Sequence, residues 1–109
     1  MDERARQRLQ DILDVADELA ETLEGTTKAS FARNKGLQRI AERLLEIAGE
    51  AATHVPDAVA KTIVADWTGL RGLRVILAHA YHRVDVATLW TAAVDHLPRL
   101  AQAVRKALD

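Results

Sequence analysis

The sequence predicts an all-α protein, an antiparallel up-and-down bundle of four to five helices in a single domain over residues 1–109. Apolar residues recur at spacings of three and four along most of the chain, which is the period of an amphipathic helix. No segment alternates between apolar and polar residues over the length of a strand. The sequence contains no internal repeat, linker or low-complexity tract that would divide it into two units.

The composition is that of a folded protein and limits the chemistry available to it. The chain is 49% hydrophobic and 28% charged, and it has no cysteine. Disulfides, thiolate zinc sites and cysteine nucleophiles are therefore excluded, which leaves His, Asp and Glu as acid–base groups or metal ligands. The formal net charge is −1, so a nucleic-acid site would have to be a local patch. No feature of the sequence calls for a cofactor.

Hydropathy indicates a cytoplasmic protein without a membrane partner. No apolar run approaches the roughly 20 residues that a membrane-spanning helix needs. The first ten residues, MDERARQRLQ, are charged where a signal peptide would become apolar.

The first half of the chain contains two long predicted helices. The first covers residues 2–24 and is followed by Gly25, a residue that favours the position after a helix C-terminus. The next segment, TTKAS, is expected to be a turn in which Thr27 or Ser30 caps the second helix. The second long helix ends near His54.

The second half begins with a short helix, over about residues 57–63, that the pattern allows but does not require. Asp66 is a suitable N-cap for a third major helix running to about Tyr81, and Asp85 can cap a fourth. Pro98 lies inside the fourth apolar pattern, and it should kink or restart that helix because it lacks a backbone donor.

The third helix has two different faces. On a helical wheel its large apolar residues share one arc, which should face the core: Leu70, Leu73, Ile76, Leu77, Ala80 and Val84. Its cationic and small residues gather on the opposite arc and its margins, and no acid occurs between Asp66 and Asp85. Small side chains on an exposed arc allow a second backbone or a ligand to approach closely.

These cations also have ordinary explanations. A histidine at a helix edge can be solvated, and arginines near a helix C-terminus interact favourably with the helix dipole. A metal site is the weakest interpretation, because His79 and His82 are three residues apart with no acid on the helix beside them. Trp67 and Trp90 are predicted to lie in the core.

Three segments, in order, resemble the HepT-like ribonuclease toxins of the HEPN superfamily, which are helical RNA-cleaving domains. The stretch RVILAHAY, residues 74–81, fits the Arg-x4-His-x-Tyr motif of these toxins. LLEIAGEAATHVP, residues 44–56, is similar to their "IGEA" helix, and LWTAAVDHLPRL, residues 89–100, is similar to the segment that comes after the motif. The ordered set is far more specific than Arg-x4-His alone.

The resemblance implies a metal-independent endoribonuclease in which two protomers pool their motif residues in one cleft. Arg74 would hold the scissile phosphate, and His79 would transfer a proton. Val75 and Ala78 would lie at the interface of the homodimer. RNA or phosphate contacts are expected from Arg71, His82 and Arg83.

The resemblance also implies a protein partner. In the best-known HepT-like systems a cognate minimal nucleotidyltransferase, the antitoxin, silences the nuclease by attaching AMP to the motif tyrosine, here Tyr81. The alternative for Tyr81 is aromatic packing on Trp67 or Trp90.

One departure from the family pattern leaves other functions open. Val75 occupies a position where the family usually has Asn or another polar residue, so activity could be weaker or absent. An inactive bundle that binds a nucleotidyltransferase or a nucleotide remains an alternative to the nuclease, and a plain helical interaction module is a third.

Overall fold

The computed structural model describes residues 1–80 and 85–109, and for residues 75–76 and 78–80 it describes the backbone alone. All regular elements in these ranges are helices, which confirms the predicted fold class. None of the described helices is long and apolar enough to span a bilayer.

The first half of the chain forms α1 (Glu3–Thr22), α2 (Lys28–Ala32) and α3 (Lys35–Thr53). Each begins at a residue whose side chain accepts a bond from a backbone N–H of the first turn: Asp2, Thr27 and Asn34. Gly25 has a φ of 77° in the link between α1 and α2, a left-handed conformation that glycine adopts without strain. The two long helices of this half, α1 and α3, therefore agree with the prediction.

The second half forms α4 (Asp57–Ala60), α5 (Trp67–Ala80), α6 (Val86–Thr91), η2 (Ala92–His96) and α7 (Leu97–Leu108). Both predicted aspartate caps are confirmed, since Asp66 accepts from the N–H of Gly69 and Asp85 accepts from that of Thr88. The hydrogen bonds from Thr88 lower the pKa of the Asp85 carboxyl.

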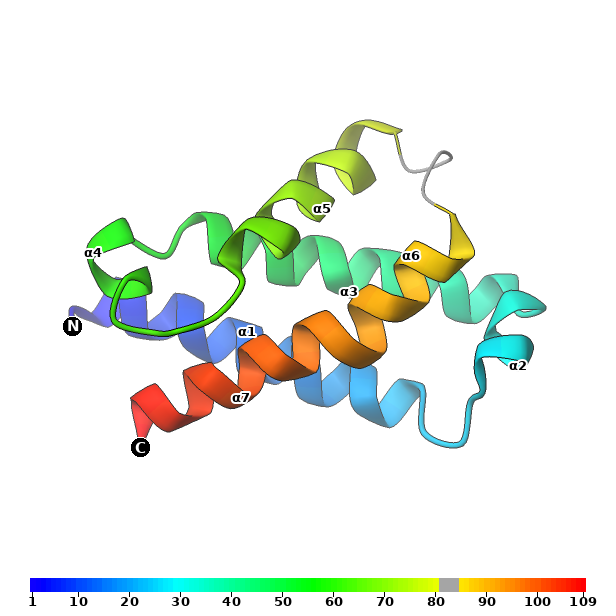
Figure 1. Cartoon of the computed structure of the whole chain (residues 1–109), viewed down its shortest axis with the longest axis horizontal. Coiled ribbons are helices and arrows are strands. Elements are labelled where there is room, and N and C mark those ends of the chain that lie inside the picture. The colour runs from blue at the N-terminus through cyan, green and yellow to red at the C-terminus, as the bar shows by residue number, and fades with distance from the viewer. Residues whose placement is uncertain (81–84) are drawn as a thin grey trace.

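The helices run up and down the bundle (Figure 1). α1 and α3 lie side by side, and the α6–η2–α7 segment returns along them so that both chain ends lie at the same end of the molecule. α5 packs chiefly on α3 and leans away from the other helices toward its C-terminal end. α5, the helix that contains Arg74 and His79 of the motif, is thus held chiefly by one neighbour, α3.

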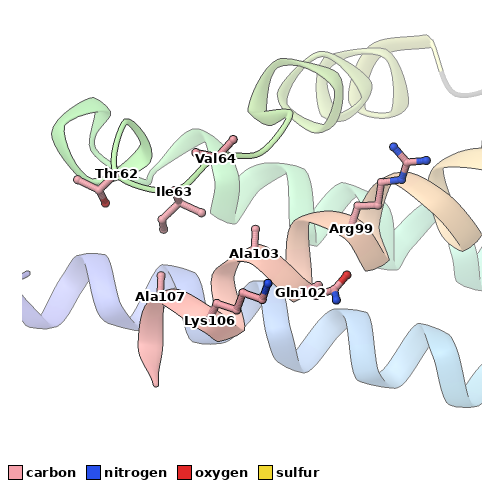
Figure 2. A pocket seen from close by; sticks show the side chains of 8 residues that line it. All are labelled: Thr62, Ile63, Val64, Arg99, Gln102, Ala103, Lys106 and Ala107. Atoms are coloured by element: carbon pink, nitrogen blue, oxygen red, sulfur yellow. The ribbon is translucent and has the colours of Figure 1, made fainter.

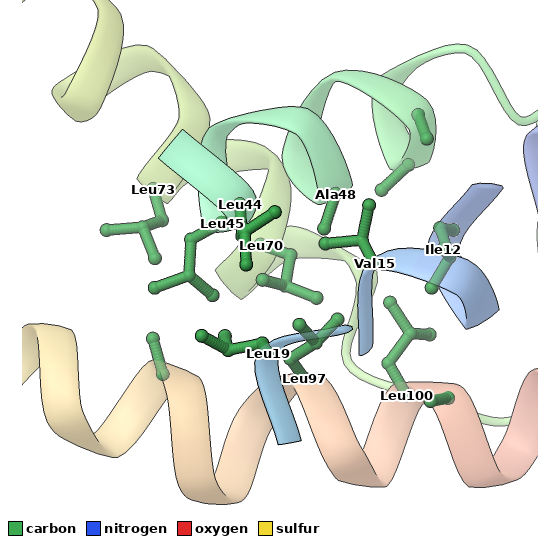
Figure 3. Packing of buried hydrophobic residues seen from close by; sticks show 14 of the residues in the cluster. Ile12, Val15, Leu19, Leu44, Leu45, Ala48, Leu70, Leu73, Leu97 and Leu100 are labelled. Carbon is green, nitrogen blue, oxygen red and sulfur yellow. The ribbon is translucent and has the colours of Figure 1, made fainter. Parts of the chain in front are cut away.

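Aliphatic side chains from α1, α3, α5 and α7 fill the space between the helices (Figure 3). Leu9, Ile12, Leu45 and Val104 are completely buried, and no polar or charged residue is buried among those described. The predicted core arc of α5 is confirmed where its side chains are described, at Leu70, Leu73 and Leu77. Ile76, Ala80 and Val84 lie outside the described side chains.

The predicted break at Pro98 takes the form of a single turn of π-helix, η2, which ends two residues before the proline. Pro98 has no N–H to donate to the preceding turn, so the chain shifts its hydrogen-bond register over Ala92–His96. The proline then occupies the first turn of α7, where its missing donor costs nothing. The helix is therefore restarted and continues along the bundle.

Two local predictions need correction, the TTKAS turn and the apolar position of Ile40. The TTKAS segment is not merely a turn, because Thr27 and Ser30 form a reciprocal capping box that starts α2. α2 carries Phe31 into the core, where its ring lies 5.2 Å from that of Trp90. Ile40, which fits the apolar pattern of α3, is 44% exposed.

Candidate active site

The side chain of Arg74 leaves α5 at the point where this helix crosses α3. Gly49 of α3 makes the crossing possible, since a Cβ atom added there would lie 2.4 Å from the Cβ of Arg74 and 2.8 Å from the carbonyl oxygen of Leu70. No residue larger than glycine fits this place without moving a helix. Gly49 therefore fixes the position of Arg74 relative to α3.

Arg74 is held by a carboxylate of the same crossing. Its Nε atom donates to Oε2 of Glu50 at 2.5 Å, and the two side chains are 32% and 41% exposed. The bond uses one edge of the guanidinium, and the rest of its planar fork can still hold a phosphate. The pair orients Arg74 at the surface without burying it.

The other oxygen of Glu50 contacts a histidine. Nδ1 of His54, one turn further along α3, lies 3.4 Å from Oε1 of Glu50. The same Nδ1 atom is 2.9 Å from the backbone carbonyl oxygen of Glu50. Arg74, Glu50 and His54 thus form one polar cluster at the α3–α5 crossing.

A hollow of about 290 Å³ opens beside this cluster, between α1, α3 and α5. Three arginines and three acids line it together with two apolar residues: Arg8, Asp11, Arg43, Glu46, Ile47, Glu50, Ala51 and Arg74. Arg43 pairs with Glu46 at 3.5 Å. The hollow offers a polar surface next to the guanidinium of Arg74.

Arg71 is engaged with the end of α3. Its Nε atom donates to the carbonyl oxygen of Ala52 at 2.9 Å, and one terminal nitrogen donates to that of Val55 at 3.1 Å. Its guanidinium also lies 5.5 Å from the centre of the Trp67 ring. These bonds satisfy carbonyl groups left open at a helix C-terminus, a role that the sequence alone did not reveal. The predicted RNA contact of Arg71 remains a prediction.

The remaining predicted site residues are described in part or not at all. The backbone of Val75, Ala78 and His79 belongs to α5, which puts His79 about 7.5 Å beyond Arg74 along the helix axis. Their side chains lie outside the described part of the structure. Tyr81, His82 and Arg83 lie outside the described residues altogether, so the roles expected of them stay predictions.

Sequence reasoning missed the two partners of Arg74 in the cluster. Glu50 stands in the segment that resembles the "IGEA" helix, and this resemblance was the available signal that it accompanies the motif. His54 stands out in the sequence only as the end of a predicted helix. Within the described residues, no three His, Asp or Glu side chains are grouped closely enough to hold a metal ion.

A larger hollow than the one beside Arg74 lies elsewhere on the molecule (Figure 2). It measures about 490 Å³ and separates the segment after α4 from α7, with Thr62, Ile63 and Val64 on one side and Arg99 and Lys106 on the other. Neither Arg74 nor Glu50 lines it. Of its two cations, Arg99 is paired with Asp95 at 3.0 Å.

The chain is a helical bundle, and one of its helices carries an arginine followed five positions later by a histidine. Both features agree with the helical RNA-cleaving domains of the HEPN superfamily. The family model described as "Ribonuclease HepT-like" matches residues 12–107. The chain belongs to this HepT-like family, within the HEPN superfamily.

Curated relatives agree with this assignment. The chain is 32% identical over 97 residues to a protein of Methanocaldococcus jannaschii that bears the name "Putative RNase", a match that covers 88% of this chain and 89% of the relative. It is 30% identical over 93 residues to the "Probable ribonuclease HepT" of Thermococcus cleftensis, covering 84% of each. No solved structure matches the chain significantly. The family and its relatives indicate a ribonuclease.

Proposed function

We propose that this protein is a metal-independent endoribonuclease, the toxin of a toxin–antitoxin pair whose other member is a minimal nucleotidyltransferase, and that it acts in the cytoplasm. The observation that carries the nuclease assignment is Arg74, which the bond to Glu50 holds half-exposed at the rim of a hollow. The family supports RNA as the substrate.

The residues suit RNA cleavage in which the ribose 2′-hydroxyl is the nucleophile. The 2′-oxygen attacks the adjacent phosphorus and forms a new P–O bond, while the bond from phosphorus to the 5′-oxygen breaks. One group accepts the proton of the 2′-hydroxyl, and His79 protonates the departing 5′-oxygen. Arg74 binds the phosphate through its planar fork and stabilises the negative charge of the transition state.

The test of this function uses the purified wild-type protein and single-stranded cellular RNA in the presence of EDTA. We expect cleavage to persist and the 5′ fragments to end in a 2′,3′-cyclic phosphate, because the nucleophile is the ribose and no metal-bound water takes part. Fragments ending in a 5′-phosphate and a free 3′-hydroxyl, or loss of cleavage in EDTA, would contradict the mechanism. A protein that binds RNA without cutting it would favour the inactive bundle, with Val75 as the first residue to restore to Asn.

We further propose that the active form is a homodimer in which the motif helices of two protomers approach each other at Val75 and Ala78. Small side chains permit close approach, and a two-fold axis would bring two copies of Arg74 and His79 into one cleft. Ala78→Glu should therefore give monomers in analytical ultracentrifugation at micromolar concentration. Ala87→Glu, on the exposed side of α6, is the matched control and should leave the dimer intact. A monomeric wild type at this concentration would rule out the shared cleft.

Tyr81 is proposed as the site that the antitoxin modifies. A phosphate attached beside Arg74 and His79 would compete with RNA for the same donors, and its bulk would block the cleft. Incubation with the cognate nucleotidyltransferase and ATP should add the mass of one AMP group to the wild type and nothing to Tyr81→Phe. Tyr81 is the only tyrosine of the chain, so peptide mass spectrometry locates the change without ambiguity. Modification of another residue would remove Tyr81 from the mechanism.

A further inference from the structure

The neighbours of His54 determine which nitrogen of its neutral ring carries the hydrogen. Its Nδ1 atom lies 2.9 Å from the backbone carbonyl oxygen of Glu50 and 3.4 Å from that residue's carboxylate oxygen Oε1. Both oxygens can only accept, so Nδ1 carries the hydrogen in the neutral ring. Nε2 is then the unprotonated nitrogen of the neutral side chain, which is 47% exposed. His54 therefore has a basic nitrogen available to a bound molecule.

The carboxylate of Glu50 connects this base with the predicted phosphate site. One of its oxygens binds Nε of Arg74, and the other lies against Nδ1 of His54. A carboxylate beside Nδ1–H fixes the orientation of the ring and leaves Nε2 free to accept a proton. The two oxygens of Glu50 thus link the guanidinium of Arg74 to an oriented histidine.

We propose that His54 is the general base of the ribonuclease site at Arg74. This inference rests on the proposed function. In the step, Nε2 of His54 accepts the proton of the 2′-hydroxyl as the 2′-oxygen bonds to phosphorus, and His79 gives a proton to the 5′-oxygen as the P–O5′ bond breaks. Water later returns both histidines to their starting protonation states.

His54 would give each chain a proton acceptor of its own, in addition to the second motif histidine that the proposed homodimer brings into the cleft. Cleavage needs one group that accepts a proton and one that donates, and each chain contributes a single motif histidine. His54 comes from α3 instead of the motif helix, so every Arg74 has a base from its own chain. The motif histidine is then needed only as the acid.

The pH dependence of the Arg74–Glu50–His54 cluster is also affected by charged groups on the helices around it. α1 contributes Arg8 and Asp11, α3 contributes Arg43 and Glu46, and α4 and α5 contribute Asp57 and Arg71. Cations and acids are equal in number in this set, and Glu50 is the group in direct contact with His54.

The decisive variant is His54→Asn. The Asn amide can donate the bond that Nδ1–H donates, but it has no group that titrates in place of Nε2. If His54 is the base, His54→Asn and His54→Ala should both lower kcat by about 10²- to 10⁴-fold with little change in KM. The fall in kcat/KM toward low pH should also disappear, since it reports protonation of the base. An Asn variant that keeps the wild-type rate and pH profile would overturn the proposal.

His96→Asn is the matched control. His96 is similarly exposed, at 49%, but it belongs to η2 and its neighbouring carboxylate is Asp95 instead of Glu50. Its substitution should leave kcat and the pH profile unchanged. An equal loss in both variants would indicate a general effect of removing a surface histidine and would overturn the specific role of His54.

A second measurement separates this proposal from the proposed function. Nitrogen-15 spectra of the imidazole rings should show neutral His54 with its hydrogen on Nδ1. A 2′-O-methylated RNA strand, which cannot be cleaved, should shift the Nε2 resonance of His54 in the wild type and much less in Arg74→Ala. A hydrogen on Nε2 of the free protein, or no shift when the strand binds, overturns the role of His54 whether or not the wild type cuts RNA. A wild type with the expected spectra that cuts no RNA contradicts the proposed function instead.

Discussion

Arg74→Ala and His79→Ala should each reduce RNA cleavage by about 10²- to 10⁴-fold. The first change removes the planar fork that holds the phosphate, and the second removes a proton donor. Arg74 is 32% exposed and lies outside the apolar core, so its loss should not unfold the bundle. Initial rates on one RNA substrate measure the loss of cleavage, and circular dichroism on the same samples shows whether the bundle stays folded.

Three further variants sharpen this result. Arg74→Lys keeps the charge but loses the two-point geometry of the guanidinium, so it should restore little activity. Arg39→Ala removes an exposed arginine whose partner is Glu42 of its own helix, and it should leave the rate unchanged. His82→Ala should have a smaller effect than His79→Ala, because it lies outside the motif. Wild-type cleavage by His79→Ala would refute the catalytic role of the motif and favour the inactive-bundle alternative.

Helix boundaries were predictable because their determinants are local. The caps at Asp66 and Asp85 act on N–H groups three residues away, so the sequence contains the whole interaction. The box of Thr27 and Ser30 is equally local, but the helix it starts has only five residues, too few for an apolar period to distinguish it from a turn. Phe31 escaped prediction for the same reason, since a single aromatic residue has no periodicity.

Interactions between helices could not be read in this way. The bond of Arg74 to Glu50 joins residues 24 apart, and that of Arg71 to Ala52 joins residues 19 apart. Arg71 and Arg74 look alike on a helical wheel, yet the first closes the end of α3 and the second faces a hollow. The different roles of the two arginines depend on where α5 crosses α3. The position of a helix crossing is set by packing over many residues.

Gly49→Ala should disturb the position of Arg74 and the stability of the bundle together. The added Cβ would lie 2.4 Å from that of Arg74 and 2.8 Å from the carbonyl oxygen of Leu70. Neither atom belongs to the flexible end of a side chain, so α5 must move away from α3. Overpacking of this kind costs about 1–3 kcal/mol, while alanine recovers about 1 kcal/mol through its higher helix propensity.

The net loss of stability should therefore be modest and the loss of activity larger. A displacement of about 1 Å in a catalytic group can lower a rate about 10²-fold, and Glu50, the partner of Arg74, comes directly after Gly49 in the chain. Urea denaturation should show a lower unfolding free energy, and kcat should fall about 100-fold. Gly72→Ala is the matched control, because a Cβ added there on α5 meets nothing within 4 Å. That variant should be at least as stable as the wild type and equally active, whereas a Gly49→Ala protein with wild-type stability and rate would show that the crossing of α3 and α5 does not set the geometry of the site.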